Sequence, residues 1–256
     1  MLGAIIGDIV GSIYEWNNHR SKQFPLFGRG CDYTDDTVCT VALADALLTG
    51  ADPAPHLQAW CQRYPGRGYG GMFLGWIQEA APAPYNSFGN GAAMRVSAAG
   101  WLADDVGSVA ALSDRITAIT HNHPEGIRGA RAVAHGILRA RQRATATQIR
   151  DEIVTAYGYE LGRTVDDIRP SYQFNESCQG TVPEALICAL SATSFEDAVR
   201  NAISIGGDSD TVAAIAGSIA EPLFGIPPDI ANRGRSYLPP DMLDVLGRFI
   251  LATTRQ

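Results

Sequence analysis

Residues 203–219 read ISIGGDSDTVAAIAGSI, which places a glycine pair, two carboxylates and an apolar run in close succession. The run after Asp210 has the spacing of a buried helix, so we expect a helix over 210–220. Asp208 and Asp210 stand at its start, where an acidic side chain gains about 0.3–1 kcal/mol from the helix dipole. The stretch therefore predicts a core helix with two negative charges at its first turn.

A second acidic cluster lies far upstream, where residues 34–37 read TDDT before another apolar helical run. Thr34 is the expected N-cap, and helix capping is a sufficient explanation for either cluster alone. Together the clusters hold more oxygen acceptors than two helix starts require. If the clusters converge, carboxylates 4 Å apart repel by about 4 kcal/mol per pair at an effective dielectric of about 20. A hard cation such as Mg²⁺ or Mn²⁺ would remove that repulsion.

Helical periodicity recurs along the chain, while sustained period-two alternation is missing. No linker, repeat or break in composition divides the sequence, so we expect one compact all-α domain over residues 1–256, built as an orthogonal helical bundle. The expected helices are 3–16, 36–48, 92–102, 108–119, 125–143, 147–157, 182–192, 195–204, 210–220 and 240–252.

Three glycines spaced four apart lie on one face of the first expected helix: Gly3, Gly7 and Gly11. Such a face would let a second backbone approach closely. Pro222 is expected to end the helix over 210–220. The four tryptophans are expected in the core: Trp16, Trp60, Trp76 and Trp101.

The composition is that of an ordinary globular protein, with 46% hydrophobic and 18% charged residues. The net charge of −7 argues against general binding to nucleic acid or an anionic membrane. The five cysteines show no C-x-x-C spacing, which suits reduced thiols. The N-terminal apolar stretch is interrupted by Asp8 and Ser12, which is typical of neither a signal peptide nor a membrane span. We expect a cytoplasmic protein.

Five motifs occur in an order that resembles the ADP-ribosylglycohydrolase family, which includes the dinitrogenase reductase-activating glycohydrolases. They are GAIIGDIVGSIYE (3–15), TDDT (34–37), SFGNGAAMR (87–95), THNHPE (120–125) and GGDSDT (206–211). The resemblance runs from about residue 3 to about residue 225.

The resemblance implies an all-α fold around two Mg²⁺ (or Mn²⁺) ions in a cleft. The metal ligands that it implies are Thr34, Asp35, Asp36, Asp208, Asp210 and Thr211. Glu15 matches a glutamate on a mobile segment, and Glu15 or Asp35 would transfer protons. The implied reaction is hydrolysis of the C1″ bond of an ADP-ribosylated protein or small molecule, with release of ADP-ribose. Carboxylates suit such a reaction because its transition state is oxocarbenium-like.

The glycine-rich stretch 86–95 is not a dinucleotide fingerprint, because no strand precedes it and Met94 replaces the third glycine. The resemblance makes it the pyrophosphate segment at a helix N-terminus, with Phe88 as the adenine aromatic. Arg95 fits a phosphate partner or a structural ion pair. Cys178 is expected to be a buried thiol rather than a nucleophile. The implied substrate-binding residues are Ser87, Phe88, Gly89, Asn90, Gly91 and His121.

The acceptor stays open, with N-linked ADP-ribosyl-arginine first and serine-linked, O-acetyl- and nucleobase-linked ADP-ribose as alternatives. Residues 208–212 (DSDTV) also fit the phosphatase motif D-x-D-x-[TV]. That motif should follow an early strand and precede a lysine, whereas Lys22, the sole lysine, lies upstream. A non-catalytic ADP-ribose binder or crystallin-like member is the other alternative, but the retained acidic residues favour an enzyme.

Overall fold

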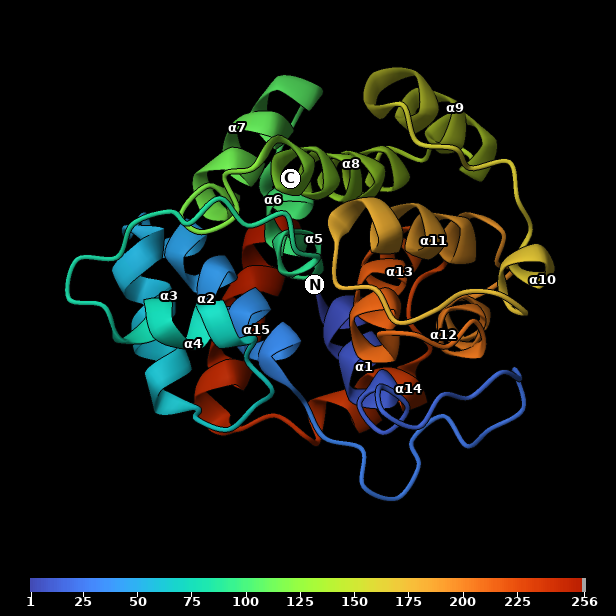
Figure 1. Ribbon diagram of the computed structural model, residues 1–256, viewed down its shortest axis with the longest axis horizontal. Helices are drawn as coiled ribbons and strands as arrows, with labels where there is room; N and C mark the ends of the chain where they lie inside the picture. Colours follow the sequence, from blue (N-terminus) through green and yellow to red (C-terminus); the bar gives the residue numbers. More distant parts are fainter. Residues whose placement is uncertain (255–256) are drawn as a thin grey trace.

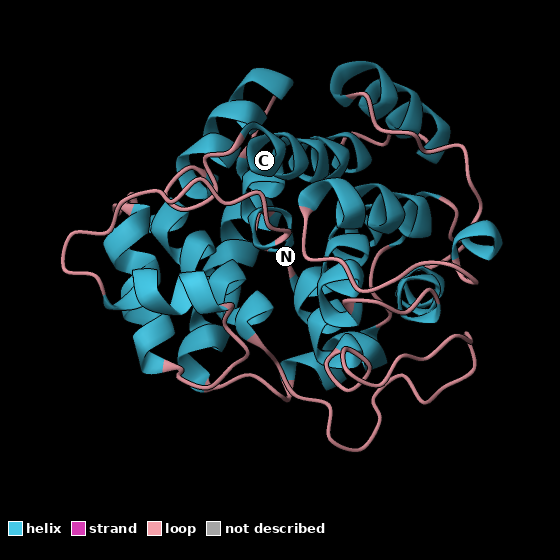
Figure 2. Ribbon diagram, viewed as in Figure 1, coloured by secondary structure: helices cyan, strands magenta, loops and turns pink. Residues whose placement is uncertain are grey.

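The computed structural model describes residues 1–254, and helices make up nearly all of its regular structure (Figures 1 and 2). No strand forms in this range, where one isolated bridge pairs Gly89 with Ser177. The all-α prediction is therefore confirmed. The helices are α1 (Leu2–Gly11), α2 (Asp35–Thr49), α3 (Pro53–Arg63), α4 (Gly71–Gln78), α5 (Gly91–Met94), α6 (Ser97–Leu102), α7 (Val106–Thr117), α8 (Pro124–Arg141), α9 (Ala146–Tyr157), α10 (Val165–Ile168), α11 (Cys178–Leu190), α12 (Phe195–Ser204), α13 (Ser209–Phe224), α14 (Pro228–Arg235) and α15 (Pro240–Thr254).

The first helix and α13 form the centre of the molecule, and their backbones touch. Every residue of α1 is buried, as is α13 from Ser209 to Ala220. A Cβ atom at Gly7 would lie 2.0 Å from the carbonyl oxygen of Ala213, and one at Gly3 would lie 2.2 Å from that of Gly217. The expectation of a closely approaching second backbone is confirmed, and the partner is the helix that follows the GGDSDT motif.

The packing of helices around α1 and α13 brings the start of α2 close to the start of α13. Helix α1 contacts both α2 and α13, while α8, α11 and α12 pack on the other sides of α13. Helix α2 begins within TDDT, and α13 begins within GGDSDT. The arrangement of α1, α2 and α13 in Figure 1 therefore brings the two acidic clusters to one region.

Three expectations about where helices end are wrong. The first helix ends at Gly11 rather than at residue 16, and Glu15 lies in the turn that follows it. The helix expected over 92–102 is divided into α5 and α6. Pro222 does not end α13, which continues to Phe224 although the proline removes one i→i−4 hydrogen bond.

The tryptophans do not all enter the core. Trp60 and Trp76 are buried, but 78% of Trp16 is exposed to solvent. Within residues 1–254, no helix combines the length and the apolar composition that a bilayer crossing requires.

Candidate metal centre and binding cavity

Most of the residues that the sequence motifs predict to be functional line one cavity of about 340 Å³. It is lined by side chains from the turn after α1, the start of α2, the loop before α5, the loop before α8 and the start of α13. The predicted site residues on its wall are Glu15, Thr34, Asp35, Asp36, Ser87, Gly89, Asn90, Gly91, His121, Asp208, Asp210 and Thr211. Phe88 is absent from the wall.

The TDDT cluster is held in place by a buried carboxylate that the motif reading overlooked. Thr34 is the N-cap of α2, since its Oγ1 accepts from Asp36 N at 3.3 Å. Asp8 of α1 accepts from Thr34 Oγ1 at 2.7 Å and from Thr34 N at 3.0 Å. It also accepts from the N–H and the hydroxyl of Thr37. An acidic residue within the otherwise apolar α1 was the signal that could have identified Asp8.

The GGDSDT cluster opens with two residues in left-handed backbone conformations. Gly206 and Gly207 have φ angles of +73° and +78°, which suit glycine because it lacks a Cβ. Asp208 occupies the N-cap position of α13, but its side chain makes no capping hydrogen bond. Instead its Oδ2 accepts from Asn90 Nδ2 at 2.6 Å. Helix capping therefore does not account for the Asp208 carboxylate.

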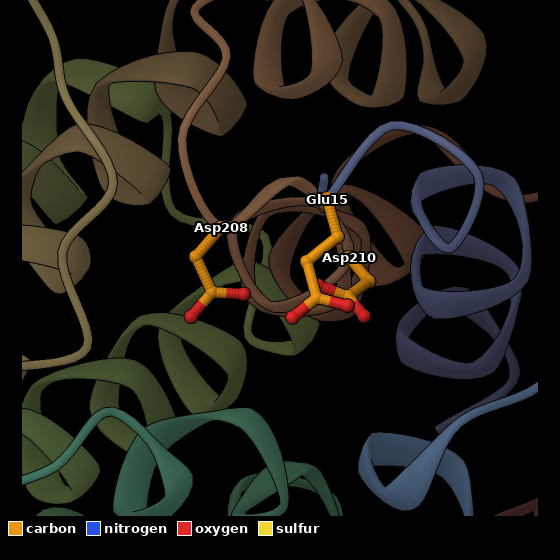
Figure 3. Close-up of side chains that lie close together, drawn as sticks. All are labelled: Glu15, Asp208 and Asp210. Carbon is orange, nitrogen blue, oxygen red and sulfur yellow. The ribbon is translucent and has the colours of Figure 1, made fainter. Parts of the chain in front are cut away.

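The two clusters meet inside the cavity. Thr211 Oγ1 of α13 donates to Asp36 Oδ2 of α2 at 3.3 Å. Carboxylate oxygens of Glu15, Asp208 and Asp210 lie within 4.8 Å of one another. Figure 3 shows the Glu15 carboxylate beside that of Asp210, with Asp208 on its other side. The convergence that sequence spacing leaves open is thus present in the fold.

Burial and mutual repulsion raise the pKa values of these carboxyl groups. Burial, followed by the charge of Asp8, raises the pKa of Asp35 to about 8. Burial and then the charge of Asp208 raise the pKa of Glu15 to about 7. The pKa values of Asp36 and Asp210 also lie well above their usual range, with burial as the main cause. Without a cation, these groups cannot all be ionised at neutral pH.

The donor set fits a divalent cation that prefers oxygen ligands. Asp36 Oδ1 is buried and has no hydrogen-bond partner within the described residues, which is a costly state for a carboxylate oxygen. Its neighbours are carboxylate and threonine oxygens, and such hard ligands suit Mg²⁺ or Mn²⁺. The residues present therefore fit the implied metal group.

His121 faces the glycines of the loop before α5. A Cβ atom at Gly91 would lie 3.1 Å from His121 Nε2, and one at Gly89 would lie 3.4 Å from it. Arg95 donates to His121 Nδ1 at 3.2 Å. Burial and the Arg95 charge hold the pKa of His121 well below its usual range. The imidazole is therefore neutral, with its proton on Nε2 toward the cavity.

Arg95 helps to position this histidine. Only 1% of the arginine is exposed, and its guanidinium also donates to Thr120 Oγ1. The structural ion pair that the sequence offered for Arg95 does not form within residues 1–254. Arg95 lines the cavity, and its buried Nε has no hydrogen-bond partner within the described residues, so a phosphate partner stays a prediction.

The loop before α5 offers fewer free donors than a helix N-terminus was expected to provide. Helix α5 has four residues. The N–H of Gly89 donates to Ser87 Oγ at 3.1 Å, and that of Asn90 donates to Glu176 O at 2.7 Å. Any anion held here would depend on the remaining donors and on side chains.

Of the two aromatic side chains in the loop before α5, Tyr85 lies on the cavity wall and Phe88 does not. Tyr85 lines the cavity, and its ring centroid lies 6.1 Å from that of His121. Phe88 is 49% exposed and packs edge-on against His123 outside the wall. The two aromatics are three residues apart in one loop, so sequence spacing alone could not distinguish them.

The buried-thiol reading of Cys178 agrees with its surroundings. Burial raises the pKa of this thiol to about 12, and its Sγ donates to Gly89 O at 3.1 Å. A thiol held in the protonated form is a poor nucleophile. Cys178 therefore supports the loop before α5 from beneath.

Comparison with known proteins gives consistent matches over most of the chain. The family model described as ADP-ribosylglycohydrolase matches residues 1–247. The "ADP-ribosylhydrolase ARH3" of Mus musculus is 26% identical, over 88% of this chain and 83% of the relative. The Homo sapiens protein of the same name is 24% identical, over 88% of this chain and 84% of the relative. A solved structure titled "ADP-ribosylglycohydrolase-related protein complex" shares the fold, with a TM-score of 0.68, 21% identity and coverage of 98% of this chain and 95% of that one.

Proposed function

Because this chain belongs to the ADP-ribosylglycohydrolase family, we propose that it is a metal-dependent hydrolase of the C1″ glycosidic bond in ADP-ribosylated substrates. The observation that carries the proposal is the convergence of Glu15, Asp36, Asp208 and Asp210 in one cavity with a buried, unpartnered oxygen on Asp36. ADP-ribosyl-arginine is the first acceptor type, with serine-linked, O-acetyl- and nucleobase-linked ADP-ribose as alternatives.

Two Mg²⁺ or Mn²⁺ ions are the proposed cofactors. The residues that would hold them are Thr34, Asp35, Asp36, Asp208, Asp210 and Thr211, all on the cavity wall. When bound, such cations supply Lewis acidity, which holds ribose hydroxyl groups and makes a nearby water more acidic. They would also offset the repulsion that raises the carboxyl pKa values.

Glu15 and Asp35 are the proposed proton-transfer groups. The Glu15 carboxylate lies close to those of Asp208 and Asp210, and Asp35 lines the same cavity, so both groups are placed where a proton could be exchanged with the reacting atoms. In the reaction, a water oxygen bonds to C1″ while the bond from C1″ to the acceptor breaks. The acceptor leaves with the bonding electrons and takes up a proton, and a carboxylate accepts the proton from water. Nearby carboxylates stabilise the positive charge that develops on the ribose.

The remaining wall residues would bind the ADP part. Ser87, Gly89, Asn90 and Gly91 form one side of the cavity, and His121 can donate from Nε2. Phe88 was the expected aromatic for adenine, but we now propose Tyr85, because Tyr85 lies on the wall and Phe88 does not. Gly89 and Gly91 approach His121 closely, so a side chain at either position would crowd the imidazole.

The test is release of free ADP-ribose from arginine-, serine-, O-acetyl- and nucleobase-linked substrates, with Mg²⁺, with Mn²⁺ and with chelator. We expect metal-dependent release from at least one substrate. Asp208→Ala and Asp35→Ala should abolish release while circular dichroism stays unchanged. Asp151→Ala, which removes an exposed carboxylate on α9, is the matched control. Full activity of Asp208→Ala would contradict the metal assignment, and tight ADP-ribose binding without release from any substrate would identify a non-catalytic binder.

A further inference from the structure

Two aromatic side chains stack on each other beside the cavity instead of entering the core. The ring centroids of Trp16 and Phe174 are 5.1 Å apart, with 25° between the ring planes. Trp16 directly follows Glu15, and Phe174 lies on the cavity wall in the connection that leads into α11. The pair therefore joins the turn that carries Glu15 to a second segment of the wall.

This pair is costly to leave in water. Trp16 is 78% exposed and Phe174 is 38% exposed. Aromatic rings of this size stabilise a fold mainly through burial, so an exposed stacked pair next to a polar cavity indicates a surface that a ligand covers. Met72, another residue of the wall, is 71% exposed and adds apolar surface to the rim.

The charges next to the pair are negative and unpaired. Glu15 and Glu176 both line the cavity, and neither takes part in an ion pair within residues 1–254. The basic residues of the wall are engaged elsewhere. Arg67 pairs with Asp32 and stacks on the Tyr33 ring, and Arg95 bonds to Thr120 and His121.

Three aromatic residues line the cavity, and Phe73 is the buried one, in contact with Tyr69 and Trp76. The other two, Tyr85 and Phe174, have different ring partners. Tyr85 contacts His121 at the loop before α5. Phe174 contacts Trp16, which is adjacent in sequence to a member of the carboxylate group. In the proposed binding mode, Tyr85 contacts the adenine. Trp16 and Phe174 then lie near the carboxylates where the bond to the ribose carbon C1″ breaks. The acceptor leaves from that carbon, so it would pass these two rings.

An aromatic face flanked by a carboxylate matches a planar cation. A guanidinium group stacks on aromatic rings and donates hydrogen bonds to a carboxylate in one plane. A serine hydroxyl or an acetyl group has neither the charge nor the flat face. Nucleic-acid phosphates would be repelled by the carboxylates of the same region.

We infer that Trp16, Phe174 and Glu176 form the subsite for the acceptor, and that this subsite takes the guanidinium group of an arginine side chain. The inference rests on the proposed function, since an acceptor subsite presupposes hydrolysis of an ADP-ribosyl bond. It extends that function by assigning acceptor choice to three residues outside the acidic motifs.

The test compares kcat/KM for ADP-ribosyl-arginine and for O-acetyl-ADP-ribose in Trp16→Leu, Phe174→Leu and Glu176→Gln. We expect each variant to lose about tenfold on the arginine substrate, the size of effect that a cation–π or charged contact supports. The change on O-acetyl-ADP-ribose should stay within about twofold, because the neutral acetyl group makes neither contact. Phe224→Leu is the matched control, since Phe224 is 39% exposed and lies at the end of α13 away from the cavity wall.

A binding measurement separates this inference from the proposed function. Agmatine, which carries a free guanidinium group, is titrated calorimetrically into protein saturated with ADP-ribose. Wild-type protein and Phe224→Leu should bind it about tenfold more tightly than the three variants. An absence of agmatine binding, or equal binding in all proteins, would overturn the subsite even if the enzyme is active.

The kinetic outcomes are equally decisive. Equal losses on both substrates would overturn the subsite and make the aromatic pair a support for Glu15. If the three variants instead lose activity selectively on a nucleobase-linked substrate, the subsite takes a neutral base rather than a guanidinium group, and the inference is overturned. If wild-type protein releases ADP-ribose from no substrate, the proposed function fails, and agmatine binding alone decides the subsite.

Discussion

Asp8 and Thr34 are joined by two hydrogen bonds, from the threonine hydroxyl to Oδ1 at 2.7 Å and from its backbone N–H to Oδ2 at 3.0 Å. Asp8 belongs to the buried helix α1, and Thr34 caps α2. The contact therefore ties the first acidic motif to the centre of the fold. The Thr34 hydroxyl donates to Asp8 and accepts from Asp36 N, which leaves one lone pair for another partner.

We predict that Asp8→Asn weakens metal binding about 10- to 100-fold, the range typical of residues that orient metal ligands. An amide has one accepting oxygen, so it cannot accept the four hydrogen bonds that Thr34 and Thr37 donate. Calorimetric titration of chelator-treated protein with MnCl₂ measures the affinity. Asp114→Asn, which makes the same change in a partly exposed ion pair with Arg131, is the control. If Asp8→Asn binds Mn²⁺ as tightly as wild-type protein does, Asp8 does not position the metal ligands.

The contact between α1 and α13 should not tolerate a methyl group. We predict that Gly7→Ala lowers the free energy of unfolding by at least about 1–3 kcal/mol, because overpacking displaces the backbone. A Cβ atom there would lie 2.0 Å from Ala213 O. Because the same helices carry Asp8 and Asp210, metal affinity should fall as well. Urea denaturation and MnCl₂ titration measure the two effects.

Gly247→Ala is the matched control for Gly7→Ala. Gly247 lies within α15, and a Cβ atom there would have no neighbour within 4 Å. Alanine should stabilise this helix by about 0.5–1 kcal/mol, because glycine loses more backbone entropy on folding. Destabilisation of similar size in both variants would mean that the close approach of α1 to α13 is not the cause.

Metal should stabilise the fold more at about pH 8 than at about pH 5. The folded-state pKa values of Glu15 and Asp35 are raised to about 7 and about 8, so between about pH 4 and pH 8 the metal-free folded state binds more protons than the unfolded state. Its stability therefore falls as the pH rises through this window. A bound cation replaces those protons and offsets the loss.

The measurement for this pH effect is the Tm with saturating MnCl₂ minus the Tm with chelator, at each pH. His121 acts in the opposite direction, because its lowered pKa makes the fold lose stability as the pH falls below its usual value. That contribution is present with and without metal, so it largely cancels in the difference. An equal metal-induced shift at both pH values would contradict the linkage.

Cys178→Ala should keep metal-dependent hydrolysis. The thiol has a pKa of about 12 and donates to Gly89 O, so it supplies packing rather than a nucleophile. We expect a loss of stability on the order of 1 kcal/mol from the small cavity. All five cysteines are buried, so a thiol reagent should label native protein slowly. If Cys178→Ala binds metal but no longer hydrolyses the substrate, the thiol does more than pack against the loop before α5.

Much of the fold could be predicted from local patterns. Apolar periodicity identified α2, α7, α8, α9 and α12 closely, because burial of one face imposes that spacing. The glycine series in α1 indicated a close backbone contact, but the series could not name its partner. The end of α1 at Gly11 was missed, because the apolar period continues to Ile13 although the helix does not.

The sequence by itself determined the chemical identity of the site, since two acidic motifs with threonines define an oxygen-rich donor set. It also determined that each motif stands at a helix start, because capping depends on a few neighbouring residues. Tertiary structure alone decided that the motifs meet, that Asp8 lies beneath Thr34, that Tyr85 rather than Phe88 lies on the wall, and that Trp16 stacks on Phe174 in solvent. The physical reason is distance along the chain: local propensity acts over a few residues, whereas Asp36 and Thr211 are separated by 175 positions and come together only through the packing of α1 against α2 and α13.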